Sequence, residues 1–143
     1  MTELWRKTAR EMVALLAKGE VRPTEAVDAA AERIEATNGA VNAMVTLCLE
    51  RAKDAAALIE SKGHPENPGP GYLYGLPISV KDLNDVASVR CTLGSPIYAD
   101  RIATESDFMV QTLEANGAIV IGKSNTPEFG AGANTFNEVF GST

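Results

Sequence analysis

The stretch SDFMVQTLEANGAIVIGKS, residues 106–124, predicts a helix that runs directly into a buried strand. Thr104 and Asp107 have the spacing of a capping box, and Asn116-Gly117 ends the helical pattern. The apolar run AIVIG (118–122) is typical of a strand. Upstream, LPISVKD (76–82) alternates apolar and polar residues and predicts another strand. A helix between two strands is typical of a βαβ unit, so we expect a sheet that is at least partly parallel.

The same stretch also fits a phosphate-binding pattern, G-x-x-x-x-G-K-[ST], at residues 117–124. A phosphate loop needs a strand before its first glycine and a helix after its lysine. Here the predicted order is reversed, because a helix precedes Gly117 and a strand fills the middle positions. We therefore predict no nucleotide site. Instead we expect Lys123 and Ser124 to emerge at the carboxyl end of a central strand, with both strands buried on both faces.

The amino-terminal part of the chain has a different character. More than half of the charged residues lie in residues 1–62, and their spacing predicts solvated amphipathic helices. We expect helices over residues 4–18, from Pro23 to Asn38-Gly39, and up to about residue 61, with a short strand within residues 43–49. Prolines and glycines make residues 63–71 a loop. This divides the chain into a helical segment, 1–62, and the first part of an α/β core, 63–143, within one incomplete domain.

Composition excludes several kinds of function. The net charge of −6 argues against nucleic acid or an anionic membrane as a partner, and no apolar run approaches a membrane span. One histidine and two distant cysteines argue against a zinc site, and we expect neither a metal nor a cofactor. His64 is expected to be a solvated loop residue. We expect Cys48 and Cys91 to be reduced thiols in a cytoplasmic protein.

Lys81 ends the second predicted strand and would share one face of it with Ser79. Two interpretations of this lysine stay open. A lysine at the end of a strand usually reaches solvent. Alternatively, a lysine held in a poorly solvated site favours its neutral form and can act as a base toward a serine.

Four blocks resemble the amidase signature family: YGLPISVKDLNDV (74–86), GSPIYAD (94–100), SDFMVQTLEANGAIVIGKSNTPEFG (106–130) and NTFNEVFGST (134–143). Residues 19–47 resemble the helical lead-in of that family. The resemblance implies an α/β fold, with a mixed sheet covered by helices on both faces. It also implies that the chain holds only the first part of that fold.

The resemblance further implies a Ser–cis-Ser–Lys triad, with Lys81 as the lysine. Both serines of the family lie in a glycine-rich loop shortly after the block that ends at Thr143, so this chain carries one catalytic residue of three. Phe129 and Gly130 are expected to border the acyl pocket. The implied substrate is a small-molecule amide, and a homodimer is one assembly to consider.

Three functions remain open at this point. The chain could represent the amino-terminal portion of an amidase or the amidase-fold subunit of a glutamine-dependent amidotransferase. The third is a non-catalytic fragment that serves folding or assembly. In each case we expect the 143-residue chain alone to be inactive on amides.

Overall fold

Residues 4–62 are mostly helical, as their apolar spacing predicts. The computed structural model describes residues 3–143. Its first helical elements are η1 (Leu4–Arg6, a 3-10 helix), α1 (Ala9–Ala17), α2 (Pro23–Val41) and α3 (Leu49–Lys62). The single helix expected over residues 4–18 is therefore divided. Thr8 interrupts it and opens α1 through a capping box with Glu11, which satisfies two backbone donors at the new helix start.

Helix α2 extends past the Asn38-Gly39 pair at which its end was predicted. The Asn38 side chain accepts hydrogen bonds from the backbone N–H groups of Ala43 and Met44, at the start of strand β1 (Met44–Leu47), and donates one to the carbonyl oxygen of Met44. This side chain therefore anchors the following strand and does not terminate the helix. α2 ends at Val41 because Asn42 adopts a left-handed φ of 52°, which asparagine tolerates better than most residues.

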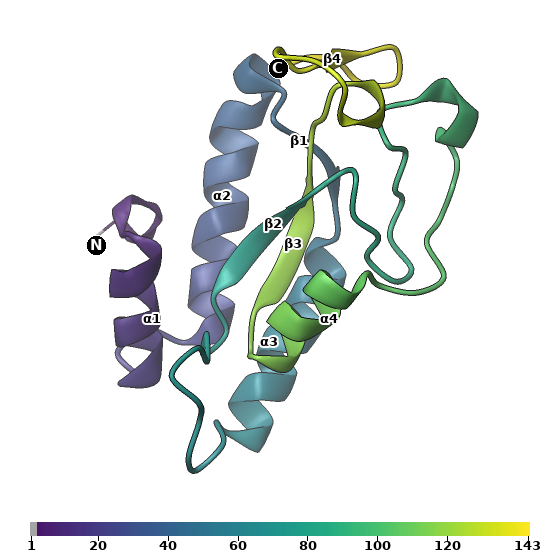
Figure 1. Cartoon of the computed structure of the whole chain (residues 1–143). Helices are drawn as coiled ribbons and strands as arrows, with labels where there is room; N and C mark the ends of the chain where they lie inside the picture. Colours follow the sequence, from purple (N-terminus) through teal and green to yellow (C-terminus); the bar gives the residue numbers. More distant parts are fainter. Residues whose placement is uncertain (1–2) are drawn as a thin grey trace.

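Three strands form a mixed sheet in the order β1-β3-β2, with β3 (Ile119–Ser124) at its centre. β2 (Pro77–Lys81) runs parallel to β3, whereas β1 is antiparallel to it. Helix α4 (Phe108–Ala115) lies on the connection between β2 and β3 and completes the βαβ unit (Figure 1). The predicted parallel pairing is confirmed.

Helices cover both faces of this sheet, as expected for the fold class (Figure 1). On one face, α2 and α3 pack on β3 through buried apolar side chains. These are Val27, Ala52, Ala56, Ile119 and Ile121. On the other face, α4 and the loop after β2 supply a second cluster. It comprises Val80, Val86, Val89, Val110 and Val120.

The two parallel strands differ in burial. β3 is buried from Ile119 to Lys123, as its apolar run predicts. β2 lies at the edge of the described sheet, and Ser79 and Lys81 are exposed on either side of the buried Val80. The expectation that β2 is central and buried on both faces concerns the complete fold and stays a prediction, because residues 3–143 give β2 a neighbouring strand on one side. Its alternating sequence correctly indicates one covered face.

Gly122 allows β1 to approach β3 closely. A Cβ atom added at this glycine would lie 2.6 Å from the carbonyl oxygen of Thr46 and 3.2 Å from the Cα of Leu47. Both of these are backbone atoms, so neither can rotate away. A side chain at position 122 would therefore push the two strands apart.

Helix α4 begins without the capping box predicted from Thr104. Asp107 occupies the N-cap position, but its side chain makes no capping hydrogen bond. The Asp107 carboxylate instead accepts hydrogen bonds from Asn84 Nδ2 (3.1 Å) and the backbone N–H of Asp85 (3.0 Å). The predicted helix end is confirmed, since Asn116 is the C-cap and Gly117 has a φ of 83°. Asp107 thus connects α4 to the loop after β2.

The remaining elements are short. They are η2 (Pro96–Tyr98), η3 (Glu128–Gly130), β4 (Phe136–Asn137) and β5 (Gly141–Ser142). The proposed boundary between residues 1–62 and 63–143 stays a prediction, although β1 of the first segment pairs with β3 of the second. Across residues 3–143, no helix combines the length and the apolar character that crossing a membrane requires.

Candidate active site

Lys81 is the last residue of β2 and is exposed, with the buried residues Val80 and Asp82 on either side of it. Within residues 3–143, none of the ion pairs involves its amine. The backbone at Lys81 is well fixed, since its carbonyl oxygen accepts a hydrogen bond from the N–H of Asn84 (3.0 Å). The amine is therefore carried by an ordered strand end and remains available to a partner group.

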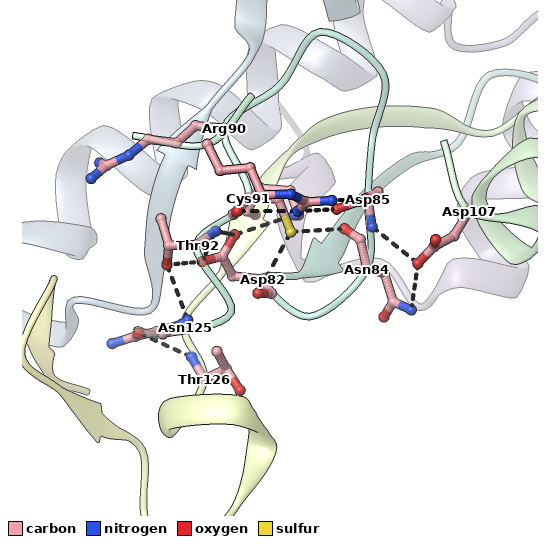
Figure 2. A network of polar contacts seen from close by, with 12 residues as sticks. Asp82, Asn84, Asp85, Arg90, Cys91, Thr92, Asp107, Asn125 and Thr126 are labelled. Atoms are coloured by element: carbon pink, nitrogen blue, oxygen red, sulfur yellow. Dashed lines mark hydrogen bonds and ion pairs between the residues drawn. The ribbon is translucent and has the colours of Figure 1, made fainter. Parts of the chain in front are cut away.

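A fully buried ion pair lies beside this strand end. Lys123 Nζ lies 3.2 Å from Asp82 Oδ1, and both side chains have an exposed fraction of 0%. Thr92 completes the cluster by donating to Asp82 Oδ2 from its backbone N–H (3.1 Å) and from Oγ1 (2.6 Å) (Figure 2). A buried carboxylate requires such partners because desolvation of an unpaired charge is costly.

This pair corrects the expectation for Lys123, which does not emerge into solvent. The sequence contained a usable signal, because Asp82 and Lys123 are opposite charges at the carboxyl ends of two adjacent parallel strands. The observed register pairs Val80 with Lys123, which brings Asp82 close to the lysine. The same finding removes the nucleotide hypothesis, since residues 119–124 are extended and the lysine already has a carboxylate partner.

The loop after Asp82 is held by further polar contacts (Figure 2). Arg101 pairs with Asp85, and this hydrogen-bonded pairing lowers the pKa of the Asp85 carboxyl. Cys91 is fully buried, and its thiol points at the carbonyl oxygens of Asp82 and Asn84. Burial raises the pKa of the Cys91 thiol, which disfavours the reactive thiolate.

Phe129 and Gly130, expected at the acyl pocket, lie close to the same loop. A Cβ atom on Gly130 would lie 2.8 Å from Leu83 Cδ1, so the glycine packs against the residue two positions after Lys81. Phe129 is 52% exposed and has a φ of 50°, while its N–H donates to the carbonyl oxygen of Leu93 (2.8 Å). A left-handed conformation at a bulky residue is uncommon and is often found at functional sites. The role of both residues stays a prediction.

Asn42 ties the end of the described chain to α2. Its Nδ2 donates to the carbonyl oxygens of Phe140 (2.8 Å) and Ser142 (2.9 Å), and Thr143 Oγ1 donates to the Asn42 carbonyl oxygen (2.9 Å). The segment that ends at Thr143 is therefore fixed against the amino-terminal helices.

Two other observations limit the chemistry of the chain. Among the residues described, no three His, Cys, Asp or Glu side chains form a group that could hold a metal ion. His64 lies in the expected loop, but it is half-buried and packs edge-to-face against Tyr74, with ring centroids 4.9 Å apart, so it is less solvated than predicted. The contact with Tyr74 indicates a packing role for His64.

Two grooves, of about 940 and 580 Å³, lie along η1, α1 and α2, and the smaller one also borders β2 at Pro77, Ile78 and Ser79. Neither groove is lined by Lys81 or Phe129. The position of the candidate site therefore follows from its side-chain chemistry.

Comparison with known proteins identifies the family. The Amidase family pattern matches residues 25–143. The chain belongs to the amidase signature family. Among its relatives, an acylamidase of Rhodococcus erythropolis is 36% identical over 137 residues, which cover 95% of this chain and 28% of that protein. A glutamyl-tRNA(Gln) amidotransferase subunit from Salinispora tropica is 36% identical over 146 residues, which cover 100% of this chain and 29% of that protein.

Solved structures agree with this membership. A bacterial aryl acylamidase of the amidase signature family superposes with a TM-score of 0.83 at 27% identity, covering 94% of this chain and 28% of that one. This amidase signature chain thus spans less than a third of the length of these relatives.

Proposed function

We propose that this chain is the amino-terminal portion of an amidase that hydrolyses a carboxamide C–N bond with a Ser–cis-Ser–Lys triad. Lys81 would supply the base of that triad. The observation that carries the proposal is the position of Lys81 at the carboxyl end of β2, in a chain of the amidase signature family. Lys81 is exposed among residues 3–143, so the poorly solvated surroundings that a basic lysine needs would come from the rest of the complete protein. In α/β folds, the carboxyl ends of parallel strands are the usual place for a site.

The proposed reaction begins with proton transfer. Lys81 accepts a proton from the bridging serine, which in turn takes the proton of the nucleophilic serine. The activated oxygen attacks the amide carbon, and backbone N–H groups stabilise the negative charge on the carbonyl oxygen. The proton returns to the leaving nitrogen as the C–N bond breaks, and water then hydrolyses the acyl-enzyme. Both serines would come from the complete protein, beyond Thr143.

Substitution of Lys81 in the complete protein tests this role. Loss of a general base should lower kcat/KM for a small aryl amide by on the order of 10² to 10⁴, and circular dichroism should show an unchanged fold. Lys53→Ala is the matched control, because Lys53 is half exposed and lies on α3. Near-normal turnover by folded Lys81→Ala would exclude the proposed role.

A second candidate is the amidase-fold subunit of a glutamine-dependent amidotransferase. It is favoured by the 36% identity to the glutamyl-tRNA(Gln) amidotransferase subunit from Salinispora tropica. The two candidates differ in substrate. An amidase should hydrolyse aryl or acyl amides without partner subunits. A transferase subunit should instead release ammonia from glutamine when its partner subunits are present.

The non-catalytic fragment is the third proposal, and the downstream coding sequence distinguishes it from the other two. Two serines in a glycine-rich loop after Thr143 would support catalysis, whereas a stop codon there would support the fragment. We also propose that the 143-residue chain alone is inactive on amides. For the complete protein we propose a small-molecule amide as substrate, a cytoplasmic location, and a homodimer as the assembly to test by light scattering.

A further inference from the structure

The buried pair of Asp82 and Lys123 holds the residue that directly follows Lys81. The Asp82 side chain is fixed by Lys123 Nζ and by two donors of Thr92, and its backbone N–H donates to the carbonyl oxygen of Ser124 (2.9 Å). Four contacts therefore converge on one residue at the end of β2. Lys81 directly precedes Asp82 in the same extended segment, so the backbone of Lys81 has little freedom to move.

Stability alone does not explain the presence of this pair. Replacing a buried ion pair by apolar side chains of similar volume is often neutral or even stabilising. Val80, which the strand register pairs with Lys123, is buried as well. Ionic pairs do, however, impose a defined distance and direction that apolar contacts do not require.

Lys81 needs such a constraint. Its side chain has four rotatable methylene groups and no ion-pair partner among residues 3–143, so the place of its amine depends on the strand that carries it. A base must lie within hydrogen-bond reach of the proton that it accepts. A displacement of about 1 Å can lower a rate on the order of 100-fold.

We propose that Asp82 and Lys123 are positioning residues for Lys81, holding the end of β2 in register with β3 so that the Lys81 amine meets its serine partner. The inference rests on the proposed role of Lys81 as a base. Asp82 and Lys123 do not touch the substrate in this scheme. They act through Lys81 alone.

Steady-state kinetics of the complete protein tests the proposal. Lys123→Met should lower kcat by about 10- to 100-fold and change KM by less than about threefold. The same substitution in a Lys81→Ala background should change the residual rate by less than about twofold, because the residue through which it acts is gone. Lys53→Met is the control for the chemical change, and it should leave both constants unaltered.

A conservative pair at Thr92 provides a second test if Lys123→Met does not fold. Thr92→Val removes the Oγ1 donor to Asp82 at nearly constant volume and should lower kcat, whereas Thr92→Ser should recover most of the loss. Thermal unfolding confirms that each variant is folded at the assay temperature.

The outcomes separate this inference from the proposed function. Full kcat in folded Lys123→Met and in Thr92→Val, together with an inactive Lys81→Ala, would overturn the positioning role and leave the amidase proposal intact. An equal loss from Lys123→Met with and without Lys81 would also overturn it. An active Lys81→Ala enzyme would remove the proposed function itself.

Discussion

Removal of Lys123 should strongly destabilise the protein, and the size of the effect follows from its burial. In Lys123→Met the apolar stem is largely retained, so little cavity forms. The main effect is on Asp82, which stays fully buried and keeps only the two donors of Thr92. Breaking a buried pair in this way typically costs about 3–5 kcal/mol of unfolding free energy. By the same reasoning, Asp82→Asn should cost several kcal/mol, because it leaves the lysine unpaired.

The double variant Asp82→Asn/Lys123→Met distinguishes a coupled pair from two independent contributions. It leaves no uncompensated charge, so its cost should fall below the sum of the single costs by at least about 2 kcal/mol. Urea unfolding of the purified complete protein, followed by far-UV circular dichroism, gives these values. Lys53→Met, at an exposed pair with a separation of 4.0 Å, should change the free energy by less than about 1 kcal/mol. Additive single costs, or a loss below about 1 kcal/mol for Lys123→Met, would refute the reasoning.

Three further predictions concern other contacts. Gly122→Ala should lower the free energy of unfolding in urea by about 1–3 kcal/mol or more, because the added Cβ meets the carbonyl oxygen of Thr46. It should also reduce the amide-exchange protection of β1, and full protection would contradict this prediction. Arg101→Gln should cost about 1 kcal/mol at neutral pH. Arg101 lowers the pKa of Asp85, so the difference in unfolding free energy from wild type should persist above about pH 4. The difference should shrink as the pH falls through the pKa of Asp85 in the folded protein, and a pH-independent difference would refute this prediction. Cys91 should resist iodoacetamide at pH 7.5 until urea is added, since burial raises its thiol pKa; rapid native labelling, read by peptide mass, would count against this.

The regular elements were predictable where local pattern decides structure. The alternation in residues 76–82 and the apolar run in 118–122 identified β2 and β3, and the helix between them predicted their parallel pairing. The end of α2 was missed because the Asn38 side chain bonds to the following strand instead of stopping the helix. The hydrogen-bond partner of Asn38 depends on where β1 lies, and the local sequence pattern does not contain this information.

The candidate site was predictable only in part. Lys81 came from the family resemblance, and its exposure agrees with the alternation of β2. The burial of Lys123 was missed because its partner, Asp82, lies 41 positions away in sequence and becomes a neighbour only through strand register. The left-handed backbone of Phe129 was likewise unpredicted. It is associated with a backbone hydrogen bond to Leu93, a contact between distant loops.

The strand order β1-β3-β2 has a consequence for biosynthesis. The central strand, β3, is the last of the three to leave the ribosome, and β1 and β2 do not pair with each other. Until Ile119–Ser124 emerges, the nascent chain therefore holds two unpaired strands whose edges can associate with other chains. Non-local pairing of this kind also slows folding. The three strands of the described sheet therefore cannot pair until this segment of six residues has emerged.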